Sequence, residues 1–505
     1  MGNPLYDRLF SIHAGKETPF LHLPNGQVLT HSDFLDMASR LANTLIGFEL
    51  EPGQRVAVQV EKSPEALALF AACVQTGLVF LPLNTAYTVS ELSYFIENSG
   101  AALVVCDDVN RAGLAPAAAA QKARLETLNA DGSGSLMRRA LGMLPAFEPV
   151  NRTEDDLAAF LYTSGTTGRS KGAMLSQANL LSNAETLVRE WRFTDDDVLL
   201  HALPIFHTHG LFVATNVVLA SGGSMIFLPK FDLDEVLRHL PDATAMMGVP
   251  TFYTRLLDDD RFTGDLACHM RLFISGSAPM LAETHQQFEA RTGHRILERY
   301  GMTETNMNTS NPYDGERRAG SVGFPLPGVE LKVTDSETGE TLPQGEIGMI
   351  EVRGPNVFQG YWEMPEKTAA ELREDGFFIT GDLGRVDADG YVHIVGRGKD
   401  LIISGGYNIY PKEVELVLDD QLGVLESAVI GVPHPDFGET VLGLLVAEPN
   451  KSPDLEAIMA SAQTQLARFK HPRKLIVLNE LPRNTMGKVQ KNALREAYKD
   501  LFTED

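Results

Sequence analysis

Short apolar runs alternate with amphipathic helical patterns through the first two-thirds of the chain. The predicted strands cover residues 55–60, 102–106 and 224–228, and the predicted helices cover 64–73 and 176–191. Ser176 is suited to cap the second helix, because its hydroxyl can accept from the free N–H groups of the first turn. This strand–helix alternation predicts α/β layers with mainly parallel sheets.

The pattern changes from about residue 320. The runs at 348–354 and 390–396 are short and bounded by turn residues, which is typical of antiparallel strands. They predict a β-rich subdomain over about residues 320–396.

A second change follows at residues 397–400, where flexible and charged residues meet. A helix beginning near Pro411 and a strand at 427–432 predict a small α/β domain. We therefore expect a large, multi-lobed N-terminal domain over residues 1–398 and a small C-terminal domain over 399–505.

Bulk composition excludes several classes of protein. Hydrophobic residues make up 44% and charged residues 22% of the chain, as in soluble globular proteins. The net charge of −24 argues against a protein that coats nucleic acid or a membrane surface, since both are anionic. Cys73, Cys106 and Cys268 stand apart, which favours neither a disulfide framework nor a thiolate zinc site.

The chain shows no apolar segment typical of a secretory signal near residue 1. The stretch 208–229 lacks charged residues, but it carries Asn216 and the pair Gly222-Gly223. It predicts a buried helix followed by a strand rather than a membrane span. We expect a cytoplasmic protein that is a monomer or a weak homo-oligomer.

Residues 162–172 carry the strongest chemical signal, and they read Tyr-Thr-Ser-Gly-Thr-Thr-Gly-Arg-Ser-Lys-Gly. Glycines allow close approach to an anion, hydroxyls and N–H groups donate to phosphate oxygens, and Arg169 and Lys171 supply positive charge. The spacing does not match the Walker A loop, because Gly165 has Gly168 three residues later. The run predicts a phosphate-binding loop of another kind, with a solvent-exposed glycine-rich turn as the alternative.

Five further motifs follow this loop in order. They are Tyr300–Glu304, Thr380–Asp382, Gly396–Asp400, Ser404–Glu413 and Pro482–Lys488. Their order and spacing resemble the adenylate-forming superfamily, which includes acyl-CoA synthetases, firefly-type luciferases and peptide-synthetase adenylation domains. The resemblance covers essentially the whole chain. It implies ATP, Mg²⁺ and coenzyme A as ligands, and a mobile C-terminal domain.

The resemblance also implies a nucleotide site. The phosphate loop would comprise Thr163, Ser164, Gly165, Thr166, Thr167, Gly168, Arg169 and Lys171, and the adenine side would comprise Gly276, Ser277, Ala278, Glu298, Tyr300 and Gly301. Thr303 would donate to the α-phosphate, Glu304 would hold Mg²⁺, and Asp382 and Arg397 would bind the ribose. Taken singly, Glu304 could satisfy amides at a helix N-terminus, and Asp382 could form an Asx turn.

The C-terminal motifs imply catalysis and thiol binding. Lys488 would neutralise charge on the α-phosphate during adenylation, with a solvated loop lysine as the alternative. Lys399 stands at the hinge position of the family. Ser404, Gly405 and Gly406 would let the narrow pantetheine arm of coenzyme A pass, unless they form only a glycine-rich turn.

In the family that the chain resembles, the residue before Tyr-Gly is usually small or an amide and lies near the substrate, which implies that Arg299 indicates the acid to be activated. A buried guanidinium is costly without an anion, and a carboxylate can pair with it bidentately. A substrate with a second carboxylate follows, the alternative being an internal ion pair with an acid such as Glu298. The runs 204–212 and 297–315 are similar to those of malonyl-CoA synthetases. That similarity implies a malonate pocket made by Arg299, His207, Thr208, Met307 and Ser277.

His201, His207 and His209 also raise the possibility of a metal site, since positions 207 and 209 would share one strand face. No carboxylate or cysteine lies nearby in sequence, which argues against a metal site. The resemblance implies instead that His207 lines the acyl pocket. The predicted reaction joins malonate, and also methylmalonate, to coenzyme A with conversion of ATP to AMP and pyrophosphate. Three alternatives stay open: a ligase for a monocarboxylic or aryl acid, an enzyme that loads a carrier protein, and a catalytically silent nucleotide-binding protein.

Overall fold

The computed structural model describes residues 2–163, 170–404, 407–484 and 487–502. Contacts between residues group the chain into two compact units, 1–330 with 352–378 and 331–351 with 379–505. This grouping joins most of the β-rich subdomain to the C-terminal part. The grouping reflects how densely residues contact one another, and it does not locate a hinge. The predicted boundary between residues 398 and 399 therefore stays a prediction.

The first sheet of the N-terminal unit has the strand order β6-β5-β3-β4-β7-β8. Its strands are β3 (Arg55–Gln59), β4 (Val79–Pro82), β5 (Leu103–Cys106), β6 (Arg124–Thr127), β7 (Leu157–Thr163) and β8 (Lys171–Ser176). All pairs are parallel except β7 with β8. The connecting helices are α3 (Pro64–Thr76), α4 (Val89–Ser99), α5 (Arg111–Ala120) and α6 (Ser135–Ala140).

The second sheet has the order β15-β14-β13-β12-β11-β9-β10-β1-β2. Its strands are β1 (Pro19–His22), β2 (Val28–Thr30), β9 (Val198–His201), β10 (Ser224–Phe227), β11 (Ala245–Gly248), β12 (Leu272–Ser275), β13 (Leu297–Met302), β14 (Asn306–Ser310) and β15 (Phe324–Pro325). The run from β1 through β13 is parallel, and β2, β14 and β15 add antiparallel edges. The prediction of mainly parallel sheets is confirmed.

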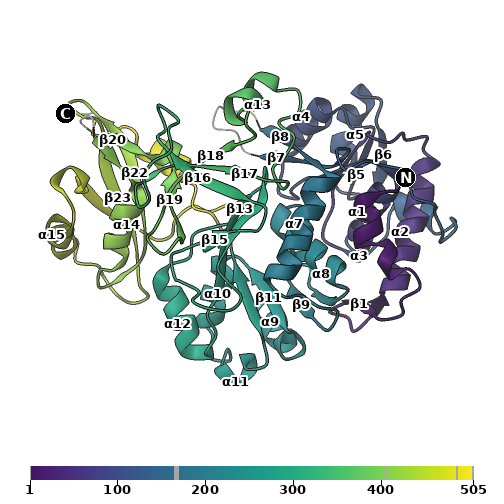
Figure 1. The fold of residues 1–505 in the computed structure, drawn as a ribbon, viewed down its shortest axis with the longest axis horizontal. Coiled ribbons are helices and arrows are strands. Elements are labelled where there is room, and N and C mark those ends of the chain that lie inside the picture. Colours follow the sequence, from purple (N-terminus) through teal and green to yellow (C-terminus); the bar gives the residue numbers. More distant parts are fainter. Residues whose placement is uncertain (1, 164–169, 405–406, 485–486, 503–505) are drawn as a thin grey trace. The chain divides into compact units, whose positions relative to one another are not determined.

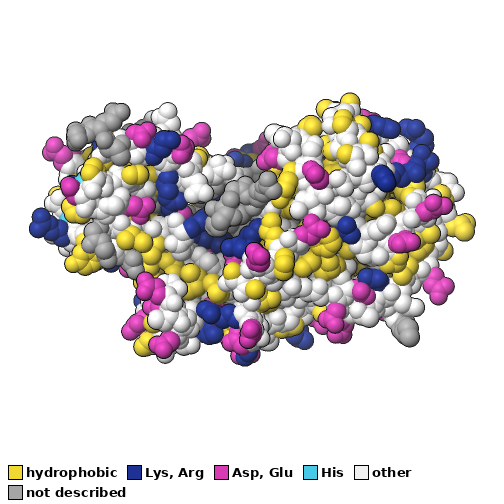
Figure 2. All heavy atoms as spheres, turned by 90° about the horizontal axis from the view of Figure 1, so that it is seen from above, with side chains coloured by type: hydrophobic (Ala, Val, Ile, Leu, Met, Phe, Trp, Pro, Cys, Tyr) yellow, Lys and Arg dark blue, Asp and Glu magenta, His cyan; other side chains and the backbone are white. Residues whose placement is uncertain are grey.

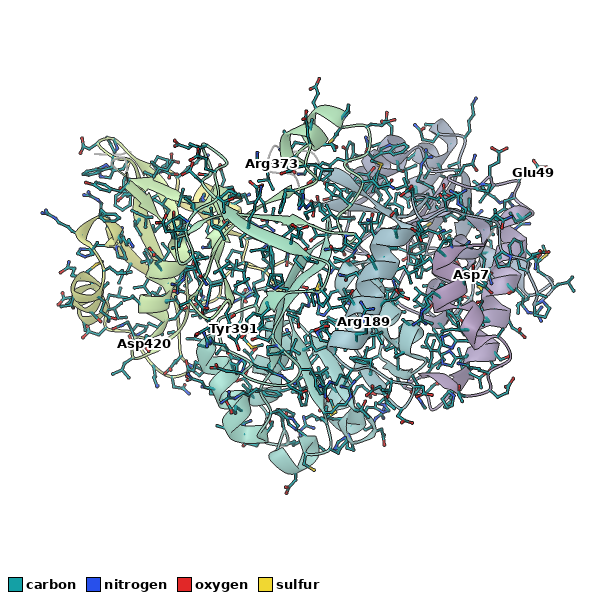
Figure 3. All side chains as sticks on the ribbon, in the orientation of Figure 1. Asp7, Glu49, Arg189, Arg373, Tyr391 and Asp420 are labelled. Carbon is teal, nitrogen blue, oxygen red and sulfur yellow. The ribbon has the colours of Figure 1, made fainter. Side chains whose placement is uncertain are left out.

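The remaining helices of this unit are labelled in Figure 1. They are α1 (Pro4–Leu9), α2 (His31–Ile46), α7 (Gln177–Glu190), α8 (Asn216–Ser221), α9 (Leu233–His239), α10 (Pro250–Leu257), α11 (Gly264–Ala267) and α12 (Ala282–Thr292). A π-helix, His209–Thr215, leads directly into α8. The predicted cap of α7 is confirmed, because the Ser176 hydroxyl accepts from the Asn179 N–H. Arg189, near the end of α7, is labelled in Figure 3.

The predicted buried helix and strand within 208–229 are confirmed as the π-helix, α8 and β10. The expectation that His207 and His209 share a strand face is wrong. The chain leaves β9 at His201 and turns into the π-helix, which begins at His209. None of the helices among the described residues is long and apolar enough to cross a membrane.

The β-rich subdomain is confirmed as a sheet of order β16-β17-β18-β19. Its strands are β16 (Glu330–Thr334), β17 (Gly348–Arg353), β18 (Phe378–Val386) and β19 (Val392–Arg397), and helix α13 (Pro365–Glu371) lies between β17 and β18 in the chain. The C-terminal sheet contains β20 (Ile402–Ser404), β21 (Tyr407–Ile409), β22 (Val424–His434), β23 (Gly438–Ala447) and β24 (Lys474–Leu478). Its helices are α14 (Pro411–Asp419), α15 (Leu455–Gln465) and α16 (Lys491–Tyr498).

Surface charge follows the composition. Acidic side chains are scattered over the face seen in Figure 2 and are interspersed with basic ones. Acidic side chains are therefore not gathered into one patch on this face.

Candidate active site

The hairpin of β13 and β14 carries several of the predicted site residues. Arg299 lies on β13, Thr303 and Glu304 lie in the turn, and Met307 lies on β14. Asn183 of α7 holds this hairpin in place. Its side-chain amide donates to the Met307 carbonyl (2.9 Å) and accepts from the Met307 N–H (3.3 Å). Both main-chain groups of Met307 are thereby held by one buried side chain.

Arg299 is buried, with 3% of its surface exposed. Its Nε and Nη2 atoms have no hydrogen-bond partner in the part of the chain that the structure describes. Burial lowers the pKa of Arg299 to about 9, with a small opposing contribution from Tyr253. A buried guanidinium with two unused donors is costly unless an anion binds to it.

Gly276 explains how the guanidinium fits. A Cβ atom at position 276 would lie 2.4 Å from the Arg299 Cζ atom, which is inside van der Waals contact. The end of β12 must therefore be glycine for Arg299 to adopt this position. The next residue, Ser277, has φ of 70°, a left-handed conformation that a non-glycine residue rarely adopts.

The alternative of an internal Arg299–Glu298 ion pair is wrong. Neighbouring residues of a strand point to opposite faces. The Glu298 carboxylate contacts His285 Nδ1 (3.2 Å) and accepts from the Gly320 N–H (3.3 Å). Burial raises the pKa of Glu298, and His285 opposes this shift. The predicted role of Glu298 in nucleotide binding stays a prediction.

Residues 207–209 contact the β13–β14 hairpin and the residue that follows Gly276. Thr208 is buried and donates to Asn306 Oδ1 (2.9 Å), while His209 Nδ1 lies 3.2 Å from the Ser277 hydroxyl. His207 Nδ1 accepts from the His209 N–H (3.2 Å). Burial and the Arg299 charge hold the pKa of His209 well below its usual value, so its ring is neutral at pH 7.

Further buried polar atoms here lack partners among the described residues. They are His209 Nε2, Ser275 Oγ and Asn306 Nδ2, in addition to the two nitrogens of Arg299. The sequence analysis missed Ser275 and Asn306. The latter has φ of 50°, and asparagine is among the residues that tolerate this conformation. Among the described residues, histidines and acidic or thiol groups form no cluster of three that could hold a metal.

The turn of the hairpin belongs to a second, contrasting cluster. The Glu304 carboxylate accepts from the Thr163 hydroxyl (3.2 Å) and the Tyr361 hydroxyl (3.1 Å). Lys171 donates to Tyr361 (3.0 Å) and forms an ion pair with Glu371 (3.1 Å). The antiparallel pairing of β7 with β8 places Thr163 opposite Lys171. Two strand ends, the hairpin turn and α13 thus meet around Tyr361.

The sequence analysis missed Tyr361 and Glu371, which lie outside the motifs. Burial and the carboxylates of Glu304 and Glu371 raise the pKa of Tyr361, so its hydroxyl stays protonated. The Tyr361 hydroxyl also lies 2.7 Å from Glu371, so its single proton alternates between the carboxylates of Glu304 and Glu371. Burial opposes ionisation of Glu371, but Lys367, Tyr361 and Lys171 together hold its pKa below the ordinary value.

Several predicted phosphate and thiol ligands fall outside the described residues. They are Ser164, Gly165, Thr166, Thr167, Gly168, Arg169, Gly405 and Gly406. Thr303, Tyr300 and Ala278 are half-buried beside the hairpin and at the end of β12. At Gly301 a Cβ atom would lie 1.9 Å from the Asn306 carbonyl oxygen, so the hairpin also requires glycine there.

The second unit holds the predicted ribose ligands. Asp382 and Arg397 are cross-strand partners on β18 and β19, and their side chains form an ion pair of 2.8 Å. Arg397 also donates to the Thr380 carbonyl (3.2 Å). The pair is thus preformed by the pairing of the two strands.

Lys488 lies in the loop before α16 with part of its surface in solvent. Desolvation by surrounding groups lowers the pKa of Lys488. The positive charges of Arg397 and Lys399 lower it further, whereas the carboxylates of Asp382 and Asp400 raise it. Lys399 is exposed in a 3₁₀ turn, and Ser404 ends β20 half-buried. The structure thus brings Lys488, Asp382 and Arg397 together within one unit.

Two family models match the chain. The model of the AMP-binding enzyme family matches residues 12–362, and that of the AMP-binding enzyme C-terminal domain matches 413–488. The chain belongs to the AMP-binding enzyme family. Its large N-terminal and smaller C-terminal α/β parts are those of AMP-binding enzymes.

Individual AMP-binding enzymes are similar over nearly the whole chain. ATP-bound MatB from Rhodopseudomonas palustris is 58% identical, with a TM-score of 0.98 over 99% of this chain and 100% of that one. A malonate–CoA ligase of Arabidopsis thaliana is 35% identical, covering 90% of this chain and 79% of its own length. A feruloyl-CoA synthase of Amycolatopsis sp is 36% identical, covering 94% of each chain.

Proposed function

We propose that this AMP-binding enzyme is an ATP-dependent malonate–CoA ligase that also accepts methylmalonate. The observation that carries the acid is the buried Arg299, whose Nε and Nη2 atoms have no partner among the described groups. A second carboxylate on the substrate would supply the missing acceptors and the missing negative charge. The similarity to a malonate–CoA ligase and to MatB supports the same choice.

The pocket around Arg299 fits a short acid. The main chain of buried Met307 is held by Asn183, and the Thr208 hydroxyl donates to Asn306, which supports a pocket of limited length. His209 Nε2 and Asn306 Nδ2 add polar atoms without partners in the described structure. We propose that Arg299 binds one carboxylate of malonate, and that His207, Thr208, Met307 and Ser277 surround its α-carbon.

The first step joins malonate to AMP. An oxygen of the other carboxylate attacks the α-phosphorus of ATP, the bond to the β-phosphate oxygen breaks, and pyrophosphate leaves. Lys488 is proposed to neutralise the charge that develops on the α-phosphate, and Thr303 to donate to one of its oxygens. Lys171, with the loop from Thr163 to Arg169, is proposed to hold the β- and γ-phosphates, and Gly276, Ser277, Ala278, Tyr300 and Gly301 to lie around the adenine.

Glu304 fits a magnesium ion. Its buried carboxylate accepts only from the hydroxyls of Thr163 and Tyr361, and it forms no ion pair with any described residue. An unneutralised buried carboxylate beside a hydroxyl offers the oxygen ligands that Mg²⁺ prefers. When bound, the ion would neutralise charge on the phosphates, while Tyr361 and Thr163 orient the carboxylate.

The second step transfers the acyl group. The sulfur of coenzyme A, after loss of its proton, attacks the malonyl carbonyl carbon, and the bond to AMP breaks. No enzyme nucleophile is needed, because the mixed anhydride is already activated. Asp382 and Arg397 are proposed to keep the AMP ribose in place, and Ser404, Gly405 and Gly406 to lie along the pantetheine arm, with Lys399 as the hinge.

The test is AMP formation from ATP and coenzyme A across malonate, methylmalonate, succinate, acetate, propionate and ferulate. We expect kcat/KM for malonate to exceed that for acetate or propionate by about 100-fold, the value of one charge-assisted interaction. A preference for ferulate or propionate would contradict the assignment. AMP formation that requires a carrier protein instead of free coenzyme A would indicate a loading enzyme.

A further inference from the structure

Lys62 is a buried lysine that the proposed chemistry does not use. It lies between β3 and α3 and is 8% exposed. Its Nζ atom donates to His201 Nδ1 (2.8 Å), to the His201 carbonyl (2.8 Å) and to the Leu203 carbonyl (3.0 Å). It also lies 4.2 Å from the centre of the Phe227 ring. All three ammonium donors are therefore used, and they connect the first sheet to the end of β9 in the second.

His201 links Lys62 to the π-helix. Because its Nδ1 accepts from Lys62, the hydrogen-bond network assigns the ring proton to Nε2. Nε2 then donates to the Gly210 carbonyl (2.9 Å), which also accepts from the Thr215 hydroxyl (2.9 Å). Gly210 is the second residue of the π-helix. One imidazole ring thus joins the ammonium of Lys62 to the start of that helix.

The two ends of the segment 202–209 are fixed in this way. Lys62 holds the Leu203 carbonyl at its beginning, and His201 holds Gly210 just beyond its end. The segment is tightly folded, since a Cβ atom at Gly210 would lie 2.0 Å from the Pro204 carbonyl oxygen. It carries His207, Thr208 and His209. Thr208 donates to Asn306 of the β13–β14 hairpin, and the Arg299 charge lowers the pKa of His209.

Burial of a lysine is expensive, and an apolar side chain of similar length would pack here at less cost. The cost is offset only by the exact placement of three acceptors. Resting on the proposed function, we propose that Lys62 and His201 are positioning residues that set the depth of the acyl pocket. They act through the segment 202–209 and select the three-carbon diacid over longer acids.

The test compares Lys62→Met, His201→Asn and His201→Gln with the natural enzyme. Asparagine can still accept from Lys62 but cannot reach Gly210, whereas glutamine can reach toward Gly210 but gives Lys62 no acceptor at the Nδ1 position. For Lys62→Met we expect KM for malonate to rise about tenfold and the malonate-over-succinate preference to fall by a similar factor, as misplaced binding groups do. KM for ATP should stay within about twofold.

Gln75→Met is the matched control, because Gln75 is a fully buried polar residue of α3 that bonds to Tyr6 and Ser39 instead. It should lower thermal stability without changing the malonate-over-succinate preference. Equal changes in KM for malonate and ATP, or the same loss of preference in Gln75→Met, would show a merely structural role and overturn the proposal. The double variant Lys62→Met/His201→Asn should be no worse than the worse single variant, since both break one connection.

Two measurements keep the outcome decisive. If Lys62→Met does not fold, ¹⁵N NMR of the histidines in the natural enzyme still tests the geometry, and a proton on His201 Nδ1 would overturn it. If the natural enzyme does not use malonate, the proposed function fails by itself. The same KM comparison is then made with the best acid of the panel against its next longer homologue.

Discussion

The two ends of the β13–β14 hairpin satisfy their polar groups in opposite ways. Beside the strands, Arg299 and His209 are buried with nitrogens that have no partner in the described residues. At the turn, Glu304 accepts from two hydroxyls, and Lys171 is paired with Glu371. Beside the strands, a ligand would supply the missing hydrogen-bond acceptors. At the turn, a ligand would have to replace partners that are already present.

This difference distinguishes two ways of building an anion site. A pocket with unused buried donors has already lost the hydration of those groups, so an anion that fits gains the full interaction. A site whose lysine is already paired gains only the difference between the new partner and the old one. We therefore expect substitutions at the two ends to change the affinities for acid and for ATP in opposite directions.

The largest effect is expected for Arg299→Met, which removes the guanidinium and keeps an apolar side chain. Malonate would lose its charged partner, so kcat/KM for malonate should fall about 100- to 1,000-fold, or about 3 to 4 kcal/mol. KM for ATP should change by less than about threefold, since Arg299 is not proposed to contact the phosphates. Initial rates of AMP release at varied malonate and varied ATP measure both.

Arg295→Met is the control for Arg299→Met, because Arg295 precedes β13 and pairs with Glu289 at the surface. It should leave both constants unchanged. Equal losses with malonate and acetate in Arg299→Met would mean that the guanidinium does not recognise a second carboxylate. The contrast between the two ends of the hairpin would then lose its functional meaning.

A smaller effect of opposite sign is expected for Glu371→Gln. This change removes the charge that pairs with Lys171 in the free protein, so the triphosphate no longer competes with it. KM for ATP should fall about fivefold, and thermal stability should fall by about 1 kcal/mol, as for a partly buried ion pair. Initial rates of AMP release at varied ATP and a thermal melt measure the two quantities.

Glu366→Gln, an exposed change on the same helix α13, serves as the control for Glu371→Gln. It should change neither KM for ATP nor thermal stability. A rise in KM for ATP in Glu371→Gln would show that Glu371 assists phosphate binding. In that case the turn is not a site of exchanged partners, and its comparison with the acyl end fails.

Sequence and structure agree best where a pattern is local. The cap at Ser176, the strand at 224–227 and the helix starting at Pro411 follow from short-range chemistry. The burial of Arg299 was also predicted, from its place before Tyr300-Gly301 in a run that resembles malonyl-CoA synthetases. The π-helix at His209–Thr215 was not, because a histidine–x–histidine pattern fits a strand face equally well.

The contacts at Tyr361 and Lys62 were beyond the sequence for another reason. Tyr361 contacts Glu304 and Lys171 across 57 and 190 residues, and Lys62 contacts His201 across 139. Neither belongs to a motif, and no local pattern marks a lysine that will be buried. Such partners are set by how the sheets pack, which only the three-dimensional arrangement reveals.

The smallest effect is expected from the neutral ring of His209. Its pKa lies well below 6.5 in the folded protein because of burial and the Arg299 charge, whereas the unfolded chain has an ordinary histidine. Below about pH 6.5 the unfolded state binds the extra proton, so the natural enzyme loses stability as pH falls. From pH 7.5 to 6.0 this group should lower the stability of the natural enzyme by about 0.8 kcal/mol.

His209→Gln, which keeps a polar side chain but cannot titrate, should not show that part of the stability loss. The difference in urea midpoint between the two proteins should therefore shift in favour of the variant on acidification, while malonate KM at pH 7.5 changes by less than about threefold. Parallel pH dependence of the two midpoints would mean that folding does not shift the pKa of His209. A shift in favour of the natural enzyme would mean that the ring is charged in the folded protein, and that the acyl end holds one more cation than the comparison with the turn assumes.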